Sequence, residues 1–73
     1  MASILTLEAL GPKGEELAMK AGDAIEVPVG YDAEFNCATF DSDAHEKEQL
    51  QAAVFDSLAA IDPDWQSHLQ VAE

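Results

Sequence analysis

The longest regular pattern in the chain is a stripe of apolar residues with the spacing of one helix face. The residues of this stripe are Leu50, Val54, Leu58 and Ile61. A helix with such a stripe must bury it against another apolar surface. We predict a long helix that begins at Asp43, because Glu46 follows three residues later in the arrangement of a capping box.

Three shorter segments alternate apolar and polar residues, as half-buried β-strands do. They are residues 3–10, 24–29 and 34–40. Pro28 cannot donate a hydrogen bond to a neighbouring strand, so we expect the second strand at an edge of the sheet. Residues 30–32 predict a turn, which would join the second and third strands in a hairpin.

Two further helices are expected to be short. Residues 15–21 carry acids in their first turn and Lys20 in their last turn, which suits the helix dipole, and Gly22 has the position of a C-terminal cap. Residues 62–63, Asp-Pro, would end the long helix and start a final one. The apolar face of this final helix would be formed by Trp65, Leu69 and Ala72.

Together these elements predict a single acidic α+β domain over residues 1–73. We expect a small antiparallel sheet of about three strands. One long helix in the C-terminal half of the chain would pack on this sheet, with short helices beside it.

The charge of the chain is strongly one-sided. The chain has fifteen Asp and Glu residues but only three Lys residues and no Arg, which gives a formal net charge of −12. A small domain needs a net charge magnitude of only about 2–8 for solubility, and repulsion between like charges weakens the compact state. We therefore interpret the excess as functional. The alternative is an acidic surface that is merely solvated, or a source organism whose proteins are generally acidic.

The acids are concentrated after residue 22. Residues 1–22 hold three acids and two lysines, whereas residues 23–73 hold twelve acids and one lysine. The acids are spread through the predicted elements, whereas a disordered acidic tail would show a contiguous run. The residues expected to bind a partner are Asp23, Glu26, Asp32, Glu34, Asp41, Asp43, Glu46 and Glu48.

The composition argues against several classes of protein. No apolar run approaches the roughly 18 residues that cross a bilayer. The sequence also lacks the basic segment followed by an apolar run that would indicate a signal peptide. We therefore expect a cytoplasmic protein. The negative charge would repel nucleic acids and anionic membranes, so neither is expected as a direct ligand. Cys37 is the single cysteine, so no disulfide within the chain is expected.

No motif indicates catalysis, a metal or a cofactor. Residues 41–45 begin like a calcium-binding loop, but Glu46 stands where that loop needs glycine and Ala52 where it needs glutamate. The one cysteine and two histidines have spacings that match no structural zinc pattern. We predict that the protein is not an enzyme and that it uses no cofactor or specific metal.

Two short segments resemble motifs of known families. Residues 56–58, Asp-Ser-Leu, are the triplet that carries phosphopantetheine in acyl carrier proteins, but Ser57 lies inside the predicted long helix instead of at a helix start. Residues 10–29 are similar to the strand, helix and Gly-Asp strand pattern of the AbrB- and MazE-type antitoxins. That resemblance implies a dimer that blocks a toxin with an acidic segment, although the basic residues that read DNA are missing here.

In size, acidity and absence of catalytic motifs, the whole chain resembles small phage-encoded anti-defence proteins of the anti-CRISPR and anti-restriction DNA-mimic type. The resemblance is one of overall style, and no residue motif carries it. It implies a stoichiometric inhibitor in the cytoplasm of a bacterial host. Its acidic surface would occupy the basic nucleic-acid-binding site of a defence complex, because carboxylates can take the place of phosphates. The alternative is an acidic antitoxin or adaptor that binds a basic partner protein through apolar anchors such as Trp65 and Phe55.

Overall fold

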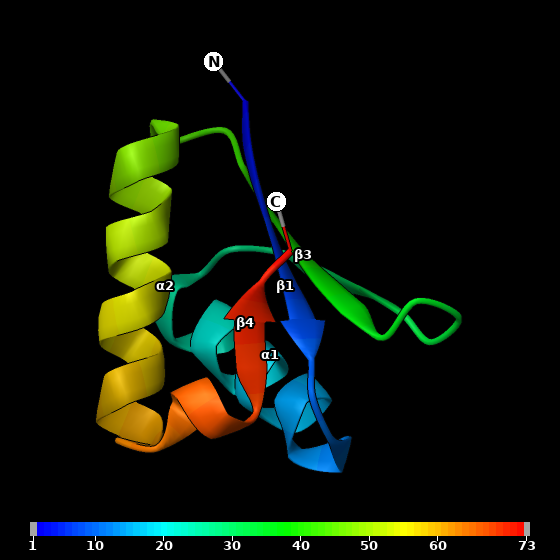
Figure 1. Ribbon diagram of the computed structural model, residues 1–73. Helices are drawn as coiled ribbons and strands as arrows, with labels where there is room; N and C mark the ends of the chain where they lie inside the picture. Colours follow the sequence, from blue (N-terminus) through cyan, green and yellow to red (C-terminus); the bar gives the residue numbers. More distant parts are fainter. Residues whose placement is uncertain (1, 73) are drawn as a thin grey trace.

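Four strands, two helices and one short 3-10 turn make up the computed structural model, which describes residues 2–72. In chain order the elements are β1 (Ser3–Ala9), α1 (Pro12–Ile25), β2 (Val29–Asp32), β3 (Cys37–Ser42), α2 (Lys47–Ile61), the 3-10 turn (Trp65–Ser67) and β4 (Leu69–Val71). The strands form one antiparallel sheet in the order β2-β3-β1-β4, and both helices lie on the same side of it (Figure 1). The α+β class and the antiparallel sheet are therefore as predicted, but the sheet has a fourth strand.

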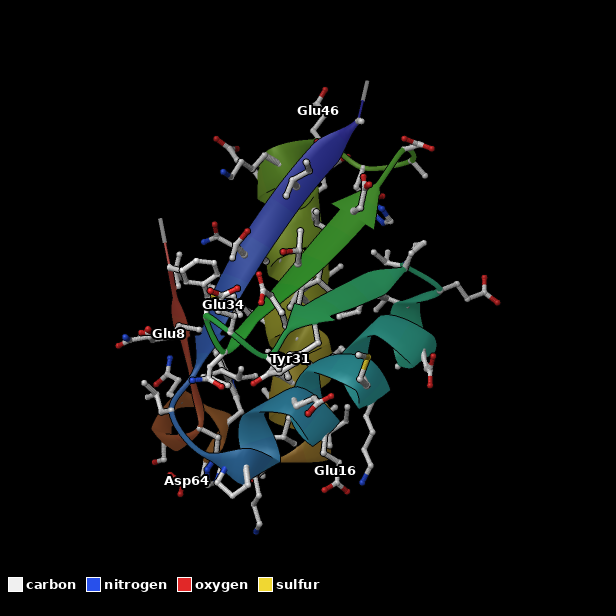
Figure 2. The ribbon with its side chains drawn as sticks, turned by 90° about the vertical axis from the view of Figure 1, so that its right-hand side faces the viewer. Glu8, Glu16, Tyr31, Glu34, Glu46 and Asp64 are labelled. Carbon is white, nitrogen blue, oxygen red and sulfur yellow. The ribbon has the colours of Figure 1, made fainter. Side chains whose placement is uncertain are left out.

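The sheet buries one face and leaves the other open. Leu5 and Leu7 of β1 are fully buried, whereas Ile4 and Glu8 point away from the helices. The pairing of β1 with β3 places Leu5 opposite the buried Phe40, so both strands bury the same face. Because successive side chains of a strand point to opposite faces, the intervening polar residues form the open face. Figure 2 shows that face in front of α2.

The predicted apolar stripe of α2 forms the centre of the core. Leu50, Val54 and Leu58 are fully buried, while Ile61 at the end of the helix is 37% exposed. The helix begins later than predicted, because Glu46 and not Asp43 is its N-cap. The side chains of Glu46 and Gln49 each accept a backbone N–H of the other residue, which completes the capping box.

The first helix is twice as long as predicted and almost as long as α2, with 14 residues against 15. It continues through Gly22 and ends at Ile25, after which Glu26 adopts the left-handed conformation of a C-terminal cap (φ 58°). Gly22 has a packing role instead of a capping role. A Cβ atom there would lie 2.2 Å from Cγ2 of Val29 and 2.9 Å from the carbonyl oxygen of Val27.

The second strand lies later in the chain than predicted. Residues 24–28 belong to the end of α1 and the connection after it, and residues 30–32, predicted as a turn, are part of β2. The predicted hairpin exists, with its turn at residues 33–36. Pro28 immediately precedes β2, which is an edge strand as expected. The third strand also begins later than predicted, at Cys37.

The final helix predicted after Pro63 is absent from the structure of residues 62–72. A short 3-10 turn leads there into β4, which pairs with β1. Trp65 and Leu69 are buried in the core, but Ala72 is exposed. The spacing of Trp65 and Leu69 suits one face of a helix, yet both are buried equally well by a turn followed by a strand.

We expect Gly22→Ala to lower the free energy of unfolding by about 1–3 kcal/mol, because the added methyl group would overlap Val29 and a backbone carbonyl. Gly30→Ala is the matched control, because no atom lies within 4 Å of the Cβ position at Gly30. Urea unfolding followed by the fluorescence of Trp65 measures both variants. Equal stability of the two would show that the close contact of α1 with β2 does not require glycine.

Candidate partner-binding surface

The acidic side chains all lie at the surface of the part of the protein that the structure describes. Of the 14 acids within residues 2–72, none is buried; Glu8 and Asp62 are half-buried and the others are exposed. Lys20 pairs with Glu16 one helical turn away on α1, at 3.0 Å. The hydrogen bond from Lys20, together with its charge, lowers the pKa of Glu16. This pair lies on α1, outside the set of acids predicted to bind a partner.

The eight acids predicted from the sequence lie in separate parts of the structure. Four lie where β3 leads into α2, which we call the connection end: Asp41, Asp43, Glu46 and Glu48. Asp23 and Glu26 lie at the end of α1. The backbone N–H of Asp41 donates to the carbonyl oxygen of Pro28 (3.1 Å), which joins the end of β3 to the segment after α1. Lys47 also belongs to this end.

The other two predicted acids, Asp32 and Glu34, lie at the opposite end, where β2 turns into β3. We call this the hairpin end. Asp32 is paired with Cys37 at the start of β3, four residues before Asp41. At about 3.3 Å per residue this separation is about 13 Å. The sequence-predicted acids therefore do not form one cluster.

Glu8 belongs to the hairpin end although the sequence analysis did not select it. The strand register places Glu8 of β1, Cys37 of β3 and Asp32 of β2 in one row across the open face. Figure 2 shows Glu8 and Glu34 on this side of the molecule. Glu8 also accepts a hydrogen bond from Gln70 of β4. The alternation of the first strand indicated that Glu8 would be on the polar face. Only the pairing of β1 with β3 shows that it lies in the same row as Asp32.

The connection that carries Asp43 is held by a small hydrogen-bond network. Oγ of Ser42 lies 2.7 Å from Nδ1 of His45 and accepts the N–H of Ala44 at 3.2 Å. Ser3 of β1 donates to the carbonyl oxygen of His45 at 2.8 Å. Ser42 is only 3% exposed, so its hydroxyl is enclosed by the surrounding chain. The Ser–His contact therefore fixes the loop, and the loop in turn fixes the acids around it.

A hollow of the described surface lies between the start of α1 and the hairpin. Its volume is about 440 Å³, and Glu15, Tyr31 and Asn36 are among its lining residues. Burial raises the pKa of Tyr31, with a further contribution from the charge of Glu15. The carboxylate of Glu15 in the wall disfavours phosphate ligands, because like charges repel.

No metal or membrane feature accompanies the acidic surface in the described residues. Within residues 2–72, no group of three or more His, Cys, Asp or Glu side chains is arranged to hold a metal ion. Neither α1 nor α2 is long and apolar enough to cross a membrane.

We expect Ser42→Ala to lower the free energy of unfolding by about 1 kcal/mol, because it removes the partner of both Ala44 and His45. Ser57→Ala is the control, since the hydroxyl of Ser57 makes only a long contact of 3.5 Å with the carbonyl oxygen of Ala21. Thermal unfolding followed by circular dichroism measures both. A loss for Ser42→Ala no greater than that for Ser57→Ala would contradict the role given to this network.

Comparison with known proteins returned no match to a family model, to a curated protein or to a solved structure. The distribution of its own residues is therefore the ground on which a function is inferred.

Proposed function

We propose that the protein is a stoichiometric inhibitor that occupies the basic nucleic-acid-binding site of a bacterial defence complex, in the manner of an anti-CRISPR or anti-restriction DNA mimic. The observation that carries the proposal is that the chain has a net charge of −12 and that none of its described acids is buried. Such charge is available to Lys and Arg side chains of another protein.

The density of charge is comparable with that of a nucleic acid. The longest dimension of the protein is 31 Å. Duplex DNA carries one negative charge per about 1.7 Å, or about 18 charges over the same length. The protein has a net charge of −12 over this length. A basic groove that binds DNA would thus meet a field of the same sign and order of magnitude.

Secondary structure also fixes the backbone positions of several acids. Asp32 and Asp41 are on strands, and Glu46 and Glu48 are at the start of α2. The Ser42–His45 contact holds the loop between them. Because the backbone is already ordered there, binding costs less conformational entropy than it would for a flexible segment, which favours affinity.

One observation favours the alternative, an acidic antitoxin or adaptor that holds a basic partner through apolar anchors. A groove lined by Phe55, Trp65 and Val71 lies beside β4. Trp65 itself is only 7% exposed, so it would form the floor of such a site instead of projecting into a partner.

Binding to the partner should weaken steeply with salt, and DNA should compete with it. The tagged protein is used to capture partners from a bacterial lysate at low salt, and they are eluted with a salt gradient and identified by mass spectrometry. We expect a nucleic-acid-binding complex that duplex or guide-bound nucleic acid displaces, because both ligands would occupy the same basic site. Salt-resistant capture that DNA does not affect would exclude the mimic and favour the adaptor.

Binding of the partner should depend more on the charges at the connection end than on the total net charge of the protein. We expect Asp41→Lys, Asp43→Lys and Glu48→Lys together to raise the Kd for the captured partner at least tenfold. The control reverses Glu15, Glu16 and Asp56, which changes the net charge equally but outside the connection end, and should change Kd less than about threefold. Circular dichroism confirms that both variants are folded. An unchanged Kd in the first variant would contradict a site at the connection end.

A further inference from the structure

The strand β4 ends the sheet, and its outer edge has no partner strand among the described residues. On its inner side it pairs with β1, with Gln70 opposite Glu8. Within residues 2–72, the sheet order places no strand beyond β4 (Figure 1). An edge strand presents unpaired N–H and C=O groups, which can hydrogen-bond to another extended chain.

The ladder shows which groups point outward. The N–H of Ala72 donates to Thr6 (3.1 Å), and the N–H of Leu10 donates to His68 (2.8 Å). These bonds lie two residues on either side of Gln70. Because bonded and non-bonded pairs alternate in an antiparallel ladder, Gln70 faces β1, while the N–H and C=O groups of Leu69 and Val71 face away from it.

An apolar groove runs beside this edge, on the side of the sheet that carries α2. Its volume is about 280 Å³, and its walls include Phe55, Trp65 and Val71. The rings of Phe55 and Trp65 are in contact, with centroids 5.0 Å apart, and Val71 is 43% exposed. The groove is smaller than the roughly 300–1,000 Å³ of small-molecule sites, so an apolar side chain of a protein suits it better than a cofactor does.

The negative charge near the outer edge of β4 favours a basic binding partner. The acids next to the two aromatic residues in sequence, Asp56 and Asp64, are exposed, and Glu8 is hydrogen-bonded to Gln70. The three lysines of the chain are in α1 or at the start of α2, and none is in β4. A second copy of the chain would bring another charge of −12 to this edge, whereas a basic segment would be attracted to it.

We propose that the outer edge of β4 binds an extended basic segment of a partner protein by strand addition. An apolar side chain of that segment occupies the groove lined by Phe55, Trp65 and Val71, and Lys or Arg residues alternate with it. Alternation follows from the geometry, because side chains of an added strand point in turn to the groove side and to the open face. The inference goes beyond the proposed function, since it does not require that the partner binds nucleic acid.

A synthetic peptide of alternating lysine and valine tests the proposal. Trp65 is the only tryptophan, so its emission reports binding at the groove, and amide exchange measured by NMR reports pairing at Leu69 and Val71. We expect a saturable change in emission and at least tenfold slower exchange at these two amides. A lysine-only peptide of equal charge, and the same alternating peptide with N-methylated amides, should produce neither effect.

Val71→Pro supplies the matching variant on the protein. It removes an outward N–H but no hydrogen bond to β1, so the fold should persist and the Kd for the alternating peptide should rise at least tenfold. Val71→Thr keeps the N–H and should raise the Kd less than the proline variant does. If Val71→Pro fails to fold, the N-methylated peptide still decides the question.

Three results would overturn the proposal. The first is equal binding of the lysine-only or N-methylated peptide. The second is unchanged exchange at Leu69 and Val71 when the alternating peptide is bound. The third is concentration-dependent dimerisation in analytical ultracentrifugation that protects these amides without peptide, which would make a second copy the occupant. None of these results depends on DNA competition or on the acids of the connection end, so the proposed function is tested separately.

Discussion

The structure depends on the packing of α2 against one face of the sheet. Leu50, Val54 and Leu58 meet the side of β1 and β3 that carries Leu5 and Phe40, and all five side chains are fully buried. A chain of about this length buries only about 60% of the surface that it exposes when unfolded. Its two helices therefore cover one face of the sheet. The open face of the sheet is a direct consequence of this one-sided core.

The fold tolerates its charge because the acids are both hydrated and dispersed. At physiological ionic strength the Debye length is about 8 Å. The connection end and the hairpin end, represented by Asp41 and Asp32, are about 13 Å apart along the sheet, so repulsion between the two ends is largely screened. Repulsion within each end remains. A basic partner would relieve it, which makes the same arrangement unfavourable for folding and favourable for binding.

The sequence predicted what depends on local pattern and missed what depends on distant contacts. The stripe of α2 and the alternation of β1 were visible as periodicities, and the exposure of the acids followed from their charge. The length of α1 could not be predicted, because Gly22 looked like a C-terminal cap. It is a glycine because a larger side chain would collide with Val29, a contact that only the folded chain reveals. In the same way, β4 depends on its pairing with β1, about 60 residues earlier in the chain. Glu8 was missed because its acidic neighbours reach it only through the register of β1 with β3.

Charge and groove would contribute to binding in different ways. Exposed carboxylates accelerate association with a basic surface and make it salt-dependent, but they discriminate poorly among basic proteins. Differences in affinity between related partners arise mostly in the dissociation rate, which depends on desolvated contacts. The edge of β4 offers hydrogen bonds in a fixed register, and the groove beside Trp65 accepts an apolar side chain and rejects a charged one. An acidic protein with both features can therefore be attracted by many basic surfaces and retained by few.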